Sequence, residues 1–184
     1  MNIAITGGIG CGKSAVIGLL RKMGKRCISC DEINAELMEE ETYIEKIKEA
    51  FPSVVSNGKI NKKALGEIIF LSPTKRKKLN SIAHPIIKER MLSLLSDKED
   101  NFVEIPLLDA KDATVFDQIW VVNCDYQNRV ERIMLRDNID SDYARRKIAV
   151  QKESVGKYVA TATITNNNNI HNLEKHVEYL LENL

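Results

Sequence analysis

The stretch AITGGIGCGKSAV, residues 4–16, contains the residues of this chain that are best suited to chemistry. Gly7, Gly12, Lys13 and Ser14 fit the spacing G-x-x-x-x-G-K-[ST], which is typical of a phosphate-binding loop. Glycines in such a loop let backbone amides approach phosphate oxygens closely. We therefore expect a nucleoside triphosphate to bind along the whole loop, through Gly7, Gly8, Ile9, Gly10, Cys11, Gly12, Lys13, Ser14 and Ala15.

Two side chains of the loop have separate expected roles. Lys13 is expected to reach the β- and γ-phosphates, and the hydroxyl of Ser14 is expected to bind Mg²⁺. A helix that begins at about Lys13 would also direct its positive end toward the same anion. The pattern therefore predicts binding of a nucleoside triphosphate together with Mg²⁺.

The elements on either side of the loop are those that such a loop requires. Residues 2–6 are predicted to form a short buried strand, and residues 14–24 a helix that stops at Gly24. Residues 25–30 are predicted to form a second strand. Strand, helix and strand in this order make a βαβ unit, which is the building block of parallel sheets.

Further strands and a final helix complete the predicted core. Residues 101–105, 118–124 and the shorter 162–165 are expected to join the same sheet. The end of the chain predicts an amphipathic helix with one apolar face, formed by Leu173, Val177, Leu180, Leu181 and Leu184. The fold class expected is α/β: a parallel P-loop NTPase sheet of about five strands, flanked by helices.

Two long polar and helical tracts interrupt this core and show no strand pattern. We expect the tract 31–96 to be a helical substrate-binding domain and the tract 125–157 to be a helical lid. The nucleotide-binding core would then consist of residues 1–30, 97–124 and 158–184.

Composition limits the partners that the chain can have. Its 184 residues carry 27 Lys and Arg against 26 Asp and Glu, a net charge of +1, which does not favour nucleic acid or a membrane surface. The basic run at 75–78 is read as a solvated helix face. The chain begins without a signal-peptide pattern, so we expect it in the cytoplasm.

Four cysteines, Cys11, Cys27, Cys30 and Cys124, raise the question of a metal or redox site. A zinc site needs two closely spaced ligand pairs, and only the pair at 27 and 30 has that spacing. We interpret all four as small apolar residues of buried strands.

The fate of the γ-phosphate depends on residues outside the loop. A GTPase switch requires an N/T-K-x-D motif, and the nearest match, residues 61–64, ends in Ala64. A motor is usually longer and usually has an acidic residue that closes a more apolar strand, and Glu104 is at best an irregular version of that residue. Transfer requires a group that orients the acceptor hydroxyl, and Asp31 follows the second strand at the edge where the loop lies. The alternative is that Asp31 only caps a helix.

Several motifs in order carry a family resemblance: TGGIGCGKS, Asp31, LNSIAHPII at 79–87, EIPLL at 104–108, RVERIMLRD at 129–137 and Gln151. In this respect the chain resembles the dephospho-coenzyme A kinase family over nearly its whole length. The resemblance implies a sheet core with a helical substrate domain and a lid, and transfer of the ATP γ-phosphate to the ribose 3′-hydroxyl of dephospho-coenzyme A.

The resemblance also assigns roles to residues. It implies that Asp31 is the base, that Arg132 and Arg136 act from the lid together with Lys13, and that the substrate contacts include Lys62, His84, Leu107 and Leu108. The partners would be ATP and dephospho-coenzyme A, and the protein a monomer or a weak homo-oligomer. Another small-molecule or nucleotide P-loop kinase remains an alternative, as does a nucleotide-dependent regulatory binding protein.

Two of these assignments have simpler alternatives. Arg129, Arg132 and Arg136 share one helical face, and guanidinium groups suit phosphate, but the face could be solvated and paired with Glu131 and Asp137. The solvated interpretation is preferred for Arg129. His84 could instead hydrogen bond the chain where Pro85 begins a helix.

The chain departs from the family pattern at several positions. Ser29 replaces the first aspartate of a D-x-D pair, Ala35 replaces a basic residue, and Lys62 stands where arginine is usual. Arg129 stands where glutamine is common. These differences concern acceptor contacts and rate more than the class of reaction.

Overall fold

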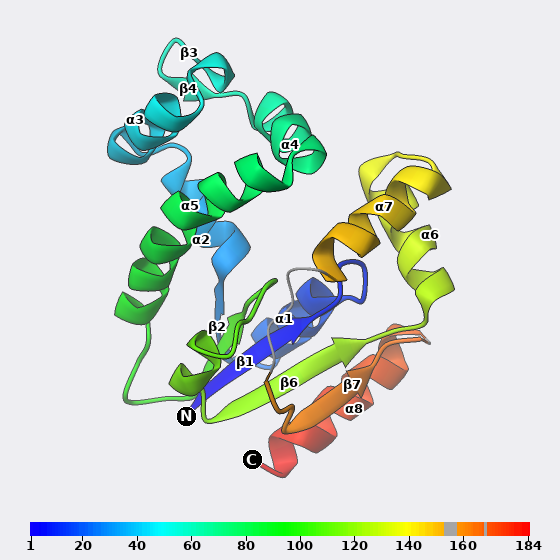
Figure 1. Cartoon of the computed structure of the whole chain (residues 1–184). Coiled ribbons are helices and arrows are strands. Elements are labelled where there is room, and N and C mark those ends of the chain that lie inside the picture. The colour runs from blue at the N-terminus through cyan, green and yellow to red at the C-terminus, as the bar shows by residue number, and fades with distance from the viewer. Residues whose placement is uncertain (153–157, 168) are drawn as a thin grey trace. The chain divides into compact units, whose positions relative to one another are not determined.

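The structure is a computed structural model that describes residues 1–152, 158–167 and 169–184. It divides into two compact units, one formed by Met1–Ser29 with Leu95–Leu184 and the other by Cys30–Leu94 (Figure 1). No helix in the described part of the chain combines the length and the apolar character that crossing a membrane requires.

The first unit is built on a parallel five-stranded sheet with the order β2-β5-β1-β6-β7. This confirms the predicted sheet, including the short last strand. Several strand ends differ from the prediction by one residue, and Cys30, which was predicted to end a strand, begins a helix. The strands are β1 (Asn2–Gly7), β2 (Arg26–Ser29), β5 (Asn101–Glu104), β6 (Gln118–Asn123) and β7 (Ala162–Thr165).

Two helices supply the apolar core of this unit. Helix α1 (Lys13–Lys22) and the carboxy-terminal helix α8 (Ile170–Glu182) join one cluster of buried side chains with alternate residues of the central strands. The predicted face of α8 buries Leu173 and Val177, whereas Leu184 lies beyond the helix and is exposed. The cluster further contains Ile3, Ile5, Val16, Leu20, Phe102, Trp120 and Ile164.

A helical pair, α6 (Tyr126–Asp137) and α7 (Ser141–Lys152), has its own small core in the same unit. Val130, Ile133, Ala144 and Ile148 are buried between the two helices, and Ile9 of the loop packs against them. The tract from 125 is therefore helical as far as it is described, and its residues 153–157 lie outside the described residues. A single 3-10 turn, η2 (Asp112–Val115), precedes β6.

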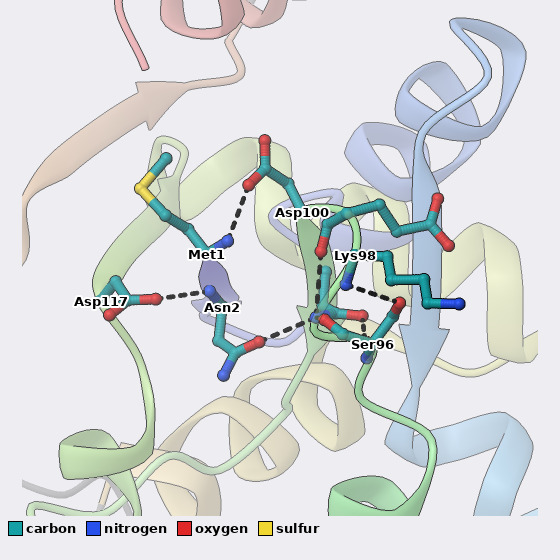
Figure 2. A network of polar contacts seen from close by, with 8 residues as sticks. Met1, Asn2, Ser96, Lys98, Asp100 and Asp117 are labelled. Atoms are coloured by element: carbon teal, nitrogen blue, oxygen red, sulfur yellow. Dashed lines mark hydrogen bonds and ion pairs between the residues drawn. The ribbon is translucent and has the colours of Figure 1, made fainter.

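Polar contacts tie together the amino ends of the strands, at the edge of the sheet opposite to the loop. The amino group of Met1 contacts Asp100 at 2.7 Å, and the amide of Asn2 donates to Asp117 at 2.6 Å. The side chain of Asn101 donates to Asn2 Oδ1 at 2.8 Å and to the carbonyl of Ser96 at 2.8 Å. Figure 2 shows this network, which fixes the start of β1 beside β5.

The second unit is mainly helical. Its helices are α2 (Cys30–Leu37), α3 (Glu41–Ala50), α4 (Lys62–Leu71) and α5 (Pro73–Ser93), with a 3-10 turn, η1 (Pro52–Val54), after α3. Asn61 and Ser72 cap the amino ends of α4 and α5 through their side-chain oxygens. The basic run at 75–78 lies in the first turns of α5.

The prediction that this tract contains no strand is wrong. Strands β3 (Val55–Ser56) and β4 (Lys59–Ile60) form a two-stranded antiparallel hairpin. Asn57 and Gly58 join them, with φ values of 50° and 71°. Positive φ at both central residues fits the type I′ turn that an Asn-Gly pair favours. Strands of two residues are too short to show alternation, so only the turn was visible in the sequence.

Pro85 also differs from expectation. It lies inside the 21-residue helix α5 and not in its first turn. A proline at that position has no amide hydrogen to donate to the preceding turn. His84 therefore does not mark the start of a helix, and its side chain is exposed.

Candidate active site

The loop between β1 and α1 surrounds the side chain of its lysine. Lys13 is 9% exposed, and its Nζ donates to the carbonyls of Gly7 at 3.1 Å and Gly8 at 3.3 Å. The amide of Cys11 donates to the carbonyl of Gly8 at 3.1 Å within the same turn. The ammonium group is thereby held at the amino end of α1, where the helix dipole favours an anion.

A buried carboxylate lies beside Ser14. Glu104, the last residue of β5, is 4% exposed. Its two oxygens accept from the hydroxyls of Ser14 at 2.9 Å and Ser29 at 3.0 Å. The strand register places Glu104 beside these hydroxyls, because Glu104 pairs with Ser29 on one side and with Ile5 on the other. The sequence presents Glu104 only as an irregular strand end, and the signal for its role is its place at the end of a strand next to the loop.

The loop is also held from the segment after β7. Asn166 is buried at 8%, and its Nδ2 donates to the carbonyl of Cys11 at 2.8 Å. Nothing local distinguishes Asn166 from the neighbouring asparagines, so only the tertiary contact identifies it.

Arg129 is half-buried and contacts the loop, contrary to the preferred sequence interpretation of a solvated side chain. Its Nε donates to the carbonyl of Ile9 at 3.0 Å, and its Nη2 contacts Gln151 Oε1 at 3.4 Å. A Cβ on Gly8 would lie 2.7 Å from Arg129 Cζ, so the guanidinium packs against loop backbone that has no room for a side chain. The amide of Ile9 donates to the same oxygen of Gln151 at 2.5 Å.

The two lid arginines named from the sequence have different surroundings. Arg132 is half-buried, and its buried Nη1 has no hydrogen-bond partner within the described residues. Arg136 is exposed at 58% of its side chain and makes a two-bonded ion pair with Asp137, at 2.7 Å and 3.1 Å. Lys147 from α7 contacts the same carboxylate at 2.6 Å. Arg136 is thus engaged within the helical pair.

The ion pair predicts how acid affects the α6–α7 pair. Hydrogen bonds from Arg136, with a further one from Lys147, lower the pKa of Asp137 from 3.8 to about 2. Because the folded pKa lies below the unfolded value, the stabilisation is complete above about pH 5 and is lost as the pH falls toward 2. Asp137→Asn should therefore lower the free energy of unfolding by about 1 kcal/mol at pH 7, allowing for solvent screening, and by nearly nothing at pH 2.

Urea unfolding at the two pH values measures this difference. Asp97→Asn, at an exposed position, is the matched control and should be neutral at both. A destabilisation by Asp137→Asn that is as large at pH 2 as at pH 7 would contradict the assignment.

All four cysteines are free, and the described residues contain no group of three or more His, Cys, Asp or Glu able to hold a metal. Their expected place in buried strands is wrong for three of them: Cys11 lies in the loop, Cys30 starts α2, and Cys124 follows β6. Burial, with a hydrogen bond to Cys11, raises the pKa of the Cys124 thiol to about 12. That thiol is protonated at neutral pH and is a poor nucleophile.

The remaining sequence-predicted residues lie in different settings. Asp31 is in the first turn of α2, two residues beyond the end of β2, and so is not ahead of the helix as a cap would be. Lys62 begins α4 and pairs with Glu39 at 3.2 Å. In the first unit, Leu108 is buried at 1% exposure, whereas Leu107 beside it is half-buried.

Comparison with known proteins gives a consistent result. A family model described as dephospho-CoA kinase matches residues 1–172. A dephospho-CoA kinase of Streptococcus pyogenes serotype M3 is 33% identical over 193 aligned positions, which cover 100% of this chain and 98% of that protein. A crystal structure of a Thermus thermophilus protein has a TM-score of 0.81 at 28% identity and covers 100% of this chain and 97% of its own. The dephospho-CoA kinase of Campylobacter jejuni has the same fold, with a TM-score of 0.63 at 23% identity over 99% and 96% of the two chains.

Proposed function

The chain belongs to the dephospho-CoA kinase family, and from this premise we propose that it transfers the γ-phosphate of ATP to the ribose 3′-hydroxyl of dephospho-coenzyme A. This is the last step of coenzyme A synthesis. The observation that supports the reaction best is the placement of a buried lysine and a hydroxyl–carboxylate pair around one loop at the head of α1.

The loop and its lysine supply the donor half of the site. Lys13 and the loop amides hold the β- and γ-phosphates, and the positive end of α1 favours the same charge. Arg132 adds a guanidinium whose buried Nη1 has no partner within the described chain. A buried donor of this kind is costly unless an acceptor reaches it, and a phosphate oxygen is a suitable acceptor. Arg136 would be the second arginine to contact the phosphates, and it would release Asp137 in order to do so.

The oxygen ligands near the loop suit Mg²⁺. This ion prefers carboxylate, hydroxyl, phosphate and water oxygens, and it is commonly held by one or two protein groups together with the phosphates of the substrate. Ser14 and Glu104 offer such a pair, already joined by a hydrogen bond of 2.9 Å. Ser14 would bind the ion and Glu104 would orient Ser14 or a bound water. The ion would neutralise charge on the phosphates during transfer.

The acceptor half of the site is assigned to the residues that the family resemblance indicates. Asp31 would orient the ribose 3′-hydroxyl and accept its proton as the phosphoryl group moves. Lys62 and His84 would contact the acceptor, together with Leu107 and Leu108. We place the enzyme in the cytoplasm, where ATP is abundant. We expect it to be a monomer or a weak homo-oligomer.

An acceptor panel tests the reaction. Purified protein with ATP and Mg²⁺ should form ADP with dephospho-coenzyme A and should form little with AMP or with no acceptor. The product should carry one new phosphate on the 3′-hydroxyl, which ³¹P NMR and mass spectrometry detect. ADP formation that is independent of dephospho-coenzyme A would contradict the proposal, and turnover with AMP would favour a nucleotide kinase.

Glu104→Gln tests the metal assignment. The change keeps the size of a 4%-exposed side chain but removes its charge, so the Ser14 hydroxyl loses a carboxylate partner. Turnover at limiting Mg²⁺ should fall by about 10–100-fold, the usual effect of groups that orient metal ligands, and excess Mg²⁺ should restore part of it. Rates measured across a Mg²⁺ series check this.

Glu99→Gln is the matched control for charge, because Glu99 precedes β5 and its side chain is 55% exposed. An unchanged Mg²⁺ dependence in Glu104→Gln would mean that Glu104 serves only the packing of the strand ends.

A further inference from the structure

Two donors from separate segments converge on one oxygen of Gln151, near the end of α7. The Ile9 amide donates to Gln151 Oε1 at 2.5 Å, and Arg129 Nη2 contacts it at 3.4 Å. The other end of the amide, Nε2, donates to the carbonyl of Pro106 at 3.4 Å. A neutral amide oxygen is therefore the common acceptor for a loop amide and a guanidinium group.

An anionic oxygen would serve these donors better than an amide. Hydrogen bonds from a guanidinium to a phosphate oxygen are charge-assisted, shorter and about twice as strong as neutral ones. The long 3.4 Å contact of Arg129 Nη2 leaves room for such an improvement. Loop amides of this motif are themselves phosphate donors. The chemistry converging on Gln151 Oε1 thus matches a phosphate oxygen more closely than an amide.

The position of Arg129 is fixed independently of Gln151. Its Nε is bonded to the Ile9 carbonyl at 3.0 Å, and its guanidinium lies against Gly8, where a Cβ would approach Cζ to 2.7 Å. Ile133, one turn further along α6, packs in the same cluster as the Ile9 side chain. Removing Gln151 from the contact would therefore leave Arg129 beside the loop.

We infer, on the basis of the function proposed above, that Gln151 Oε1 occupies the place of an oxygen of the ATP phosphate chain. In the complex, Arg129 and the Ile9 amide bind that phosphate oxygen, and Gln151 withdraws from both. Arg129 is then a phosphate-binding residue of this chain, and Gln151 is a residue that occupies the phosphate position in the free protein and competes weakly with the nucleotide. Its withdrawal also ends its contact with Pro106, in the segment after β5.

Two substitutions of Gln151 separate this role from simple bracing. Gln151→Leu removes the competing acceptor at similar size, so the Kd for ATP should stay equal or decrease by a few fold. Gln151→Glu places an anion against Arg129, so the Kd for ATP should increase by about 10-fold or more. If Gln151 only linked the loop to Pro106, ATP binding should be weaker in both variants. Isothermal titration calorimetry with ATP, without acceptor, measures the two values.

Arg129→Gln tests the other half of the inference. Its Kd for ATP should increase by about 10-fold or more, because a charge-assisted contact to phosphate is lost. Its Kd for AMP should change much less, since AMP lacks the β- and γ-phosphates. An ATP Kd within twofold of the unmodified protein would overturn the assignment of Arg129.

A charge control and a folding control accompany the Gln151 variants. Gln127→Glu adds the same charge at an exposed position of α6 and should leave ATP binding unchanged. Thermal melts identify a variant that fails to fold, and Gln151→Asn then replaces Gln151→Leu as the variant with a shortened acceptor. Equal weakening by Gln151→Leu and Gln151→Glu would overturn the inference. Because the readout is nucleotide binding without acceptor, failure of the acceptor panel would leave this result interpretable.

Discussion

Replacing Lys13 by methionine is expected to lower kcat/KM by about 10²–10³-fold. Removal of one preorganised group that stabilises transition-state charge has an effect of this size. Lys13 is 9% exposed and its Nζ is fixed by two loop carbonyls, so its charge lies in surroundings that screen it poorly. Methionine keeps the length and apolar stem of the side chain, which separates loss of charge from loss of packing.

The measurement combines steady-state kinetics, ATP binding and thermal unfolding. Lys22→Met, at the exposed end of the same helix, is the control and should leave all three unchanged. The melting temperature of Lys13→Met should be close to that of the unmodified protein, since a buried charge is removed together with its bonds. A kcat/KM within about tenfold of normal would mean that the loop amides and the helix carry the phosphate charge without Lys13.

The elements around the loop were predictable because their signals are local. Short apolar runs and the glycine pattern indicate β1, α1 and β2 within 30 residues, and the βαβ order predicts a parallel sheet. The strand order has no such signal, because β5 lies between β1 and β2. The hairpin at Asn57 and Gly58 was missed because two-residue strands carry no period. The Asn-Gly pair is the sequence signal for this hairpin, because it favours a type I′ turn.

The contacts that complete the site have no local signal. Arg129 reaches Ile9 across 120 residues, Gln151 reaches it across 142, and Asn166 reaches Cys11 across 155. Helical spacing placed Arg129 on a face with Arg132 and Arg136 but could not decide whether solvent or the loop covers that face. In the folded chain the loop covers Arg129, because Ile133 of α6 and Ile9 of the loop pack in one cluster.

Ser29 shows how a departure from the family pattern can be accommodated. Its hydroxyl donates to Glu104 Oε2 at 3.0 Å, so it satisfies one oxygen of a buried carboxylate. An aspartate at this position would bring a second negative charge against Glu104, and like charges at such a distance raise a pKa or need a cation between them. With serine at this position, the strand pairing brings no second carboxylate against Glu104.

Asp31→Asn is expected to lower kcat by about 10²–10⁴-fold, the range for loss of a general base, while the Kd for ATP stays within twofold. Asparagine keeps the shape of the side chain and can still accept a hydrogen bond, but it cannot accept a proton. The lower part of the range would indicate that Asp31 mainly aligns the acceptor hydroxyl, because a loose phosphoryl transfer depends less on proton removal than on alignment. Rapid-quench kinetics with dephospho-coenzyme A measure the chemical step directly.

The competing role for Asp31 makes a different prediction. A carboxylate in the first turn of α2 stabilises the helix by about 0.3–1 kcal/mol through the dipole, and asparagine would lose that amount without affecting turnover. Glu36→Gln, at an exposed position of the same helix, is the matched control and should leave kcat unchanged. If Asp31→Asn lowers stability slightly and keeps kcat within threefold, Asp31 supports the helix only, and the acceptor must be activated by another group.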